Sequence, residues 1–180
     1  MLNFFRKILN NDVNDGATNL EHELSDMFSV INVDIELLNG GKMPERTTDK
    51  AACYDVFARE IEKIADDTYY VKLGFNATPD NNFKIVIVPR SSITKTNWIL
   101  QNSPGQGDND YHLEYQARFK AFPNGYDKKT NKLTYPDFPY NVGERVAQMY
   151  ISYVHDLHFN QVTEINKSTN RTGGFGSTGV

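Results

Sequence analysis

The chain has 180 residues, enough for one domain with a short extension but too few for two full-sized domains. Hydrophobic residues make up 39% of it, and its formal net charge of −4 leaves no basic excess to neutralise duplex nucleic acid. Its single cysteine, Cys53, excludes an intrachain disulfide, and no run approaches the roughly 18 apolar residues of a membrane helix. We therefore expect an unprocessed cytoplasmic protein without nucleic-acid or membrane partners, in which any anion site is local.

The first 29 residues differ in pattern from the rest. Apolar residues recur there at helical intervals, and Thr18 to Glu21 has the spacing of a capping box. We expect residues 1–29 to form a helical N-terminal extension that packs on the domain or on a neighbouring subunit. A partner-binding or membrane-surface helix is the alternative.

Residues 30–165 show the two-residue period of half-buried strands. Alternation covers 31–37, 71–77, 115–121 and 146–154, while 83–88 is largely apolar and suits a central strand. The segment 60–66 is compatible with a short helix. Many short strands separated by Pro, Gly and Asn predict an all-β sandwich, barrel or jelly roll, with a long excursion over 122–141.

Several stretches carry groups suited to anions. Pro89-Arg-Ser-Ser follows the buried run and places a guanidinium and two hydroxyls at the end of a rigid strand. Gly105-Gln-Gly-Asp-Asn-Asp-Tyr predicts a tight turn whose backbone can approach a ligand, with Asp108 and Tyr111 flanking a pocket. An ordinary turn is the alternative for each stretch taken alone.

The C-terminus reads RTGGFGSTGV, from Arg171 to Val180. Its glycines expose backbone N–H groups, Ser177 and Thr178 add hydroxyls, and Phe175 offers a flat apolar face. These groups are suited to binding phosphates while the aromatic ring stacks on a base. The alternative interpretation of the segment is a disordered linker end. The scattered histidines predict no zinc site, whereas a Mg²⁺ held mainly by substrate phosphates needs few protein ligands.

In chain order, five stretches resemble the five motifs of the trimeric deoxyuridine triphosphatase (dUTPase) family. The resemblance runs from about Ile31 to Gly179, and 18 positions separate Arg90 from Asp108, as is usual in that family. The motif-bearing stretches are 52–58, 89–93, 105–111, 143–148 and the C-terminal segment.

The resemblance implies a jelly-roll β homotrimer with three active sites at subunit contacts, each closed by the C-terminal arm of one chain, residues 166–180. It also implies Mg²⁺-assisted cleavage of dUTP to dUMP and pyrophosphate. Asp108 would activate the attacking water, and Tyr111 would lie against the deoxyribose. The turn from Asn102 to Asp108, which includes Gly107, would read uracil.

The remaining roles implied by the resemblance concern phosphates, the base and the metal. Asp55 would act near the waters of Mg²⁺ or brace the phosphate-binding loop, and Arg145 would be structural or a weak phosphate partner. Phosphate contacts are expected from Arg90, Ser91, Ser92, Gln148, Arg171, Gly176, Ser177 and Thr178, with Phe175 stacking on uracil.

The sequence departs from the family pattern at four places. Cys53 stands where glycine is usual, Gly107 replaces a β-branched residue, His112-Leu113 replaces Arg-Gly, and Arg171 is one residue closer to Phe175. Two alternatives to dUTP hydrolysis remain: a dUTPase-fold protein whose main role is to bind a host regulatory protein, and a dCTP deaminase.

Overall fold

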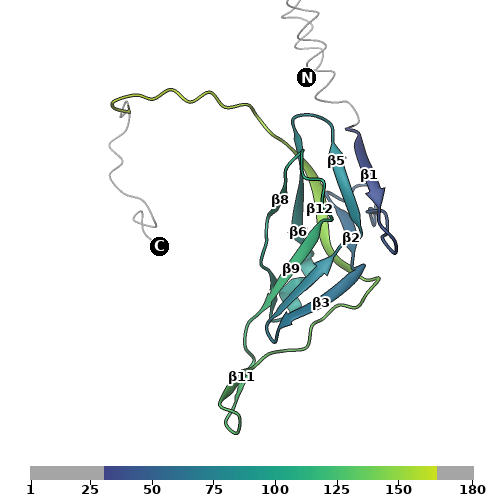
Figure 1. Cartoon of the computed structure of the whole chain (residues 1–180), viewed down its shortest axis with the longest axis vertical. Helices are drawn as coiled ribbons and strands as arrows, with labels where there is room; N and C mark the ends of the chain where they lie inside the picture. The colour runs from purple at the N-terminus through teal and green to yellow at the C-terminus, as the bar shows by residue number, and fades with distance from the viewer. Residues whose placement is uncertain (1–30, 166–180) are drawn as a thin grey trace, which may run out of the picture.

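The computed structural model describes residues 31–165, which form mainly antiparallel strands around one apolar core (Figure 1). The expected N-terminal helix and the C-terminal arm lie outside the described residues. The elements are β1 (Val33–Leu37), β2 (Tyr54–Phe57), β3 (Glu60–Ala65), β4 (Thr68–Lys72), β5 (Phe75–Pro79), β6 (Phe83–Pro89), the 3-10 helix η1 (Ser91–Lys95), β7 (Trp98–Leu100), β8 (Gly105–Gly107), β9 (Gln116–Ala121), β10 (Gly125–Asp127), β11 (Lys132–Thr134) and β12 (Arg145–Tyr153).

In the described part of the chain, two four-stranded sheets make up the body. One has the order β2-β12-β6-β8 and the other β3-β4-β9-β7, while β1 pairs with β5 and β10 with β11. All these pairings are antiparallel. The order of the strands in the sheets departs from their order in the chain, so distant segments become neighbours. The expected all-β, jelly-roll-like fold is confirmed.

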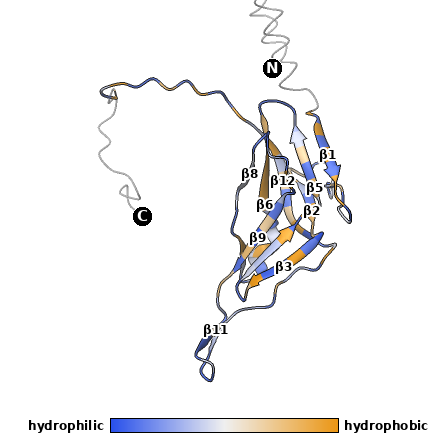
Figure 2. Ribbon diagram, in the orientation of Figure 1, coloured by the Kyte–Doolittle hydropathy of each residue, from blue (hydrophilic) through white to orange (hydrophobic). Residues whose placement is uncertain are grey.

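The core lies between the sheets and takes side chains from both. Ile85 on β6 and Phe119 on β9 are fully buried, as is Phe75 on β5. Strand β6 carries hydrophobic colour along most of its length (Figure 2). The central run at β6 and the alternation along β9 and β12 are therefore confirmed, because strands with one or both faces covered need these patterns.

The expected strand over 71–77 is interrupted. Gly74 has a φ of +78°, which side chains rarely tolerate, and it separates β4 from β5. A Cβ on Gly74 would lie 2.5 Å from the Cα of Gly41, so a close approach of two backbones also requires glycine here. The alternation continues across the break, because Val71, Leu73 and Phe75 are all buried.

The short helix considered over 60–66 is wrong, because Glu60–Ala65 is strand β3. It pairs antiparallel with β4, with Ile61 opposite Val71. An ion pair between Lys72 and Glu60, 2.9 Å long, links the same two strands. Pairing with β4 thus overrides a weak local helical pattern.

The excursion over 122–141 contains the hairpin β10–β11, which projects from the lower end of the molecule (Figure 1). After β12, residues 154–165 leave the body as an irregular segment. Leu157 and Phe159 in this segment are 70% and 84% exposed. Within residues 31–165, no helix is long and apolar enough to cross a bilayer.

Candidate functional site

The first half of the site is organised by a buried carboxylate, Asp55 on β2, which is 2% exposed. Its Oδ1 accepts hydrogen bonds from Arg90 Nε and Gln148 Nε2, each 3.1 Å long. Its Oδ2 accepts from Thr47 Oγ1 at 2.9 Å and Arg145 Nη1 at 3.2 Å. Asp55 therefore holds two predicted phosphate contacts, Arg90 and Gln148, in one group with Arg145.

Strand pairing explains why these residues meet. β12 lies between β2 and β6, and its Gln148 pairs with Asp55 on one side and Val88 on the other. Arg90 follows β6 directly and points back to Asp55, which anchors one edge of its guanidinium. The Arg90 side chain is still 23% exposed, so part of it is available to a ligand.

The ionised form of Asp55 is favoured in this position. Burial by itself raises the pKa of this carboxyl, but hydrogen bonds from Thr47 and Gln148 and the charge and hydrogen bond of Arg90 outweigh burial and lower it. A carboxylate that is charged, buried and engaged through both oxygens is suited to fixing two arginines. It is poorly placed to bind a metal directly. This favours a role for Asp55 in bracing the phosphate-binding loop over a role near the waters of Mg²⁺.

Ser91 and Ser92 open the helix η1, directly after Arg90. Ser91 is exposed and Ser92 is half-buried. Their backbone turns at the end of the rigid strand β6, as the sequence predicts. The Arg90 carbonyl accepts a hydrogen bond from Ile93 N at 3.1 Å, which closes the turn.

The second half of the site is a cleft of about 400 Å³ between β8 and β9. Asn102, Gly107 and Tyr111, all predicted for nucleoside binding, line it. The Asn102 side chain is fixed from both ends: its Nδ2 donates to Gln116 O at 3.0 Å and its Oδ1 accepts from Arg118 N at 2.9 Å. These two bonds fix the orientation of the amide at the wall of the cleft.

Asp108 lies directly after β8, beside the cleft, and is exposed. Its carbonyl accepts a hydrogen bond from Tyr111 N at 3.0 Å, so the two residues belong to one tight turn. Asn109 ties this turn to the body by donating to Pro79 O at 2.8 Å. An exposed carboxylate on an anchored turn is suited to orienting a water molecule.

Gly107 faces a residue that the sequence analysis did not single out for the site, Tyr115. A Cβ on Gly107 would overlap the Tyr115 hydroxyl and lie 2.5 Å from ring carbon Cε1. The aromatic ring therefore takes the space that a β-branched side chain at 107 would need. The large Tyr115 ring thus compensates for the small residue at 107, which explains the departure from the family pattern there. The glycine at 107 was the one sequence signal for this contact.

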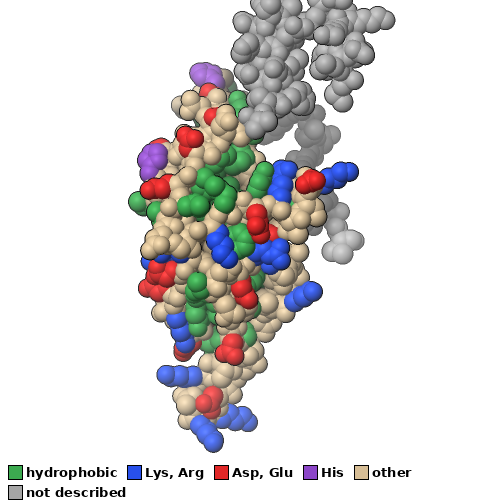
Figure 3. All heavy atoms as spheres, turned by 90° about the vertical axis from the view of Figure 1, so that its right-hand side faces the viewer, with side chains coloured by type: hydrophobic (Ala, Val, Ile, Leu, Met, Phe, Trp, Pro, Cys, Tyr) green, Lys and Arg blue, Asp and Glu red, His purple; other side chains and the backbone are tan. Residues whose placement is uncertain are grey.

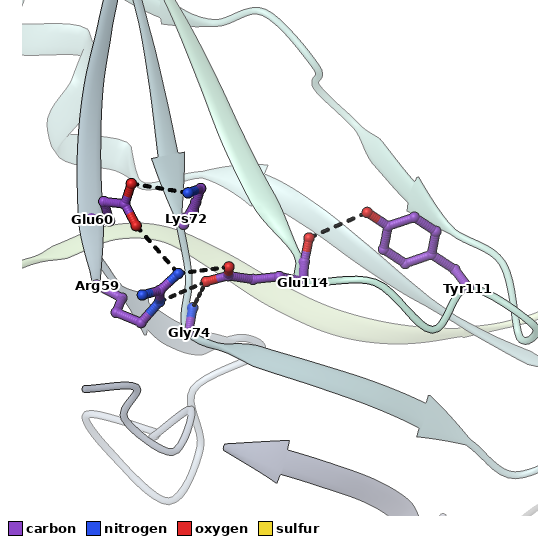
Figure 4. Close-up of polar contacts among 6 residues, drawn as sticks. All are labelled: Arg59, Glu60, Lys72, Gly74, Tyr111 and Glu114. Carbon is purple, nitrogen blue, oxygen red and sulfur yellow. Dashed lines mark hydrogen bonds and ion pairs between the residues drawn. The ribbon is translucent and has the colours of Figure 1, made fainter. Parts of the chain in front are cut away.

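Tyr111 is held by a polar network that also escaped the sequence analysis (Figure 4). Its hydroxyl donates to Glu114 O at 3.2 Å. The Glu114 carboxylate accepts two hydrogen bonds from Arg59, through Nε and Nη2, each 2.8 Å long, and a third from Gly74 N at 2.9 Å. Burial tends to raise the pKa of Glu114, but the bonds from Arg59 and Gly74 lower it overall.

The two halves of the site are not brought together within one chain. Ile85 pairs with Gly107, so Asp108 lies beyond the end of β8, next to the start of β6. Arg90 follows the opposite end of β6, six residues from Lys84. At about 3.3 Å per residue, the separation along the strand is about 20 Å. The predicted residues Arg171, Phe175, Gly176, Ser177 and Thr178 lie outside the described residues.

Comparisons with known proteins identify relatives of the chain. It is 31% identical over 144 residues to the deoxyuridine 5′-triphosphate nucleotidohydrolase of Rickettsia bellii, covering 78% of this chain and 89% of the relative. It is 31% identical over 140 residues to the enzyme of that name from Helicobacter hepaticus, covering 77% and 82%. No protein-family model matches the chain.

Solved structures show the same fold. The dUTPase of Staphylococcus bacteriophage 80alpha, determined with dUPNHPP, superposes with a TM-score of 0.65 at 22% identity, covering 83% of this chain and 99% of the phage protein. A mutant dUTPase from phage phi11 of S. aureus, described with a structural Mg(II) ion, superposes with a TM-score of 0.59 at 21% identity. The match covers 76% of this chain and 99% of the phage protein. Identity above 30% over more than two thirds of the chain places this protein in the deoxyuridine 5′-triphosphate nucleotidohydrolase (dUTPase) family.

Proposed function

We propose that this chain is a dUTP diphosphatase that hydrolyses dUTP to dUMP and pyrophosphate, limiting uracil in DNA and supplying dUMP. The observation that carries the proposal is the cleft between β8 and β9. Residues predicted for uracil and deoxyribose line it, and the predicted water-activating carboxylate follows on the next residue of the chain. Membership of the family supplies the substrate class.

In the proposed reaction, Asp108 orients a water molecule and accepts its proton as the water oxygen bonds to the α-phosphorus. The bond from the α-phosphorus to the bridging oxygen breaks, and pyrophosphate leaves. Tyr111, anchored through Glu114, lies against the deoxyribose. Arg90, with Ser91, Ser92 and Gln148, holds phosphate oxygens. Positioning and charge neutralisation suffice, so no covalent nucleophile is needed.

The donor set fits a Mg²⁺ that arrives with the nucleotide. Among residues 31–165, no group of three or more His, Cys, Asp and Glu forms a ready-made metal site. Mg²⁺ is commonly bound through one or two carboxylates together with substrate phosphates and water. When bound, it would neutralise charge on the phosphate oxygens. Asp55 is already engaged through both oxygens, so we assign it to bracing Arg90 and Arg145.

We further propose that the active form is a homotrimer with composite sites. The separation of about 20 Å along β6 between Asp108 and Arg90 supports this, because one nucleotide's α-phosphorus cannot be served by both residues of the same chain. A site at a subunit contact would combine the cleft of one chain with the Asp55 group of another.

An apolar groove of about 550 Å³ supports assembly through the C-terminal segment. Val33 and Ile35 of β1, with Met149 and Ile151 of β12, line it. Hydrophobic side chains gather on the face that carries β1 (Figure 3). Residues 154–165, which leave the body with exposed apolar side chains, would cover such a surface on a neighbouring chain.

The remaining parts of the proposal follow the sequence. Residues 30–165 form the catalytic domain, and 1–29 form an appendage. Residues 166–180 close the site, with Arg171 and Gly176 to Thr178 on the distal phosphates and Phe175 over uracil. A cytoplasmic location stays a prediction. If a host regulatory protein binds, the projecting hairpin β10–β11, with Tyr126 and Leu133 each 53% exposed, is the surface we assign to it.

The test is pyrophosphate release with Mg²⁺ and dUTP, dTTP, dCTP or UTP. We expect turnover of dUTP alone, and ammonia release from dCTP would favour a deaminase instead. Asp108→Asn should retain substrate binding but lower kcat by roughly 10²- to 10⁴-fold, the usual contribution of a general base. Asp110→Asn, a neighbouring exposed carboxylate, is the matched control. An unchanged rate in Asp108→Asn would remove this residue from the mechanism.

Truncation before Gly173 tests the arm. We expect the truncated protein to remain a trimer and lose most of its turnover, because the arm closes the site without building the core. Normal activity of the truncated trimer would contradict this role.

A further inference from the structure

Tyr115 is the residue of the cleft that the proposed reaction does not use. It precedes β9 and is 4% exposed. Its ring stacks on Phe75, with centroids 5.4 Å apart, and meets the Tyr111 ring edge-on at 5.2 Å. Its backbone is bound on both sides, since its N–H donates to Phe75 O at 3.1 Å and its carbonyl accepts from Leu73 N at 3.0 Å. The position of its hydroxyl is therefore well defined.

That hydroxyl is buried and has no hydrogen-bond partner within residues 31–165. Buried polar groups in folded proteins are nearly always paired, because leaving one unpaired costs stability. Phenylalanine would give the same packing without this cost. An unpaired hydroxyl at the wall of a ligand cleft therefore suggests a partner that binds there.

The surroundings of the hydroxyl are those of the nucleoside site. It lies against Gly107, and both residues line the cleft between β8 and β9. Burial first, and then the charges of Tyr111 and Asp108, raise the pKa of Tyr115 to about 12. The group is therefore a neutral donor at physiological pH, and it needs an acceptor.

We propose that the Tyr115 hydroxyl is a substrate-binding group that donates a hydrogen bond to an oxygen of the bound nucleoside. The inference rests on the proposed function, since it deepens the description of the same cleft. The acceptor is the 3′-hydroxyl of deoxyribose or a carbonyl of the base, both of which are neutral oxygen acceptors. Because the hydroxyl is covered in the free protein, the wall of the cleft shifts slightly when the nucleotide enters.

Tyr115→Phe removes the oxygen and keeps the ring. We expect the Kd for dUMP and the KM for dUTP to rise about three- to tenfold, the loss of one neutral hydrogen bond. The Tm of the ligand-free protein should stay the same or rise, because an unpaired buried hydroxyl is removed. A structural role would instead lower Tm. Tyr69→Phe, on β4 and outside the lining of the cleft, with its ring stacked on Phe138, is the matched control and should change neither Kd nor KM.

Kinetics with 2′,3′-dideoxy-UTP distinguish the two acceptors. If the acceptor is the sugar hydroxyl, Tyr115→Phe weakens dUTP but leaves the dideoxy substrate unaffected. If it is the base, both substrates are weakened equally. The inference would be overturned if Tyr115→Phe had the wild-type Kd and KM, or if it had a lowered Tm and a fall in kcat alone. Either outcome would leave the proposed dUTP hydrolysis by the wild type intact. A wild-type protein that neither binds nor hydrolyses dUTP would overturn the proposed function, and this inference with it.

Discussion

Replacing Asp55 by asparagine tests whether one buried carboxylate organises the phosphate half of the site. The substitution keeps the shape and one acceptor oxygen but removes the charge that Arg90 and Arg145 share. Hydrogen bonds to charged groups contribute about 1.5–3 kcal/mol each, so losing two sets an upper range of about 3–6 kcal/mol. The arginines are 23% and 41% exposed, so water replaces part of the loss.

We therefore expect Asp55→Asn to lower the free energy of unfolding by about 2–4 kcal/mol. For a chain of this length, Tm should fall by roughly 5–15 °C. Because the pKa of Asp55 is lowered in the folded state, its contribution is full above the ordinary value of 3.8 and is lost as the pH falls below it. The difference between wild type and variant should therefore be large at pH 7 and shrink below about pH 4.

Urea denaturation at pH 7 and pH 3, at equal protein concentration, measures both effects. Asp34→Asn, which removes one exposed carboxylate from β1, is the control and should change stability by less than about 0.5 kcal/mol. If Asp55→Asn were as stable as the wild type at pH 7, or if its deficit did not depend on pH, the role assigned to this carboxylate would be refuted.

Three further predictions concern the cleft. Gly107→Ala should lower the free energy of unfolding by about 1–3 kcal/mol, because its methyl group overpacks against Tyr115. In urea unfolding, the double variant Gly107→Ala/Tyr115→Leu should lose less stability than the sum of the two single variants. Additive losses would show that the Tyr115 ring is not what fills the space beside Gly107. Arg59→Lys keeps the charge but loses the two-pronged contact with Glu114, so we expect about 1–2 kcal/mol lower stability and a raised KM for dUTP as Tyr111 loosens; wild-type values would show that the network does not position this ring. Burial raises the pKa of Tyr115 from 10.0 to about 12, so the folded state resists ionisation of this hydroxyl. The wild type should therefore keep its full stability below pH 10.0 and lose part of it as the pH rises toward 12, and alkaline unfolding of Tyr115→Phe should lack this part of the loss.

The sequence predicted what depends on periodicity and motif chemistry. The buried run at β6 and the alternation of β9 and β12 identified the sheets, because a covered face requires apolar side chains at fixed intervals. The segment 60–66 was misjudged because its strand character comes from pairing with β4, which no local pattern reveals.

The site was harder to predict because its residues meet through long-range packing. Asp55 and Arg145 lie 90 positions apart and are joined only because β12 pairs with β2. The contact between Arg59 and Glu114 likewise depends on how distant segments pack. The exchange of size between Gly107 and Tyr115 left only one sequence signal, a glycine where a larger residue is usual, and nothing local indicated which aromatic filled the space.

The placement of Asp108 and Arg90 at opposite ends of β6 also determines how inactivating substitutions in one chain affect the sites of a mixed trimer. In the proposed trimer, a chain with a defective Asp108 still lends its arginine to a neighbour, and a chain with a defective Arg90 still lends its carboxylate. Mixed trimers of two inactive variants would then contain some intact sites, so two broken copies of the gene would complement each other. A single defective copy would lower activity in proportion to its share of the subunits rather than abolish it.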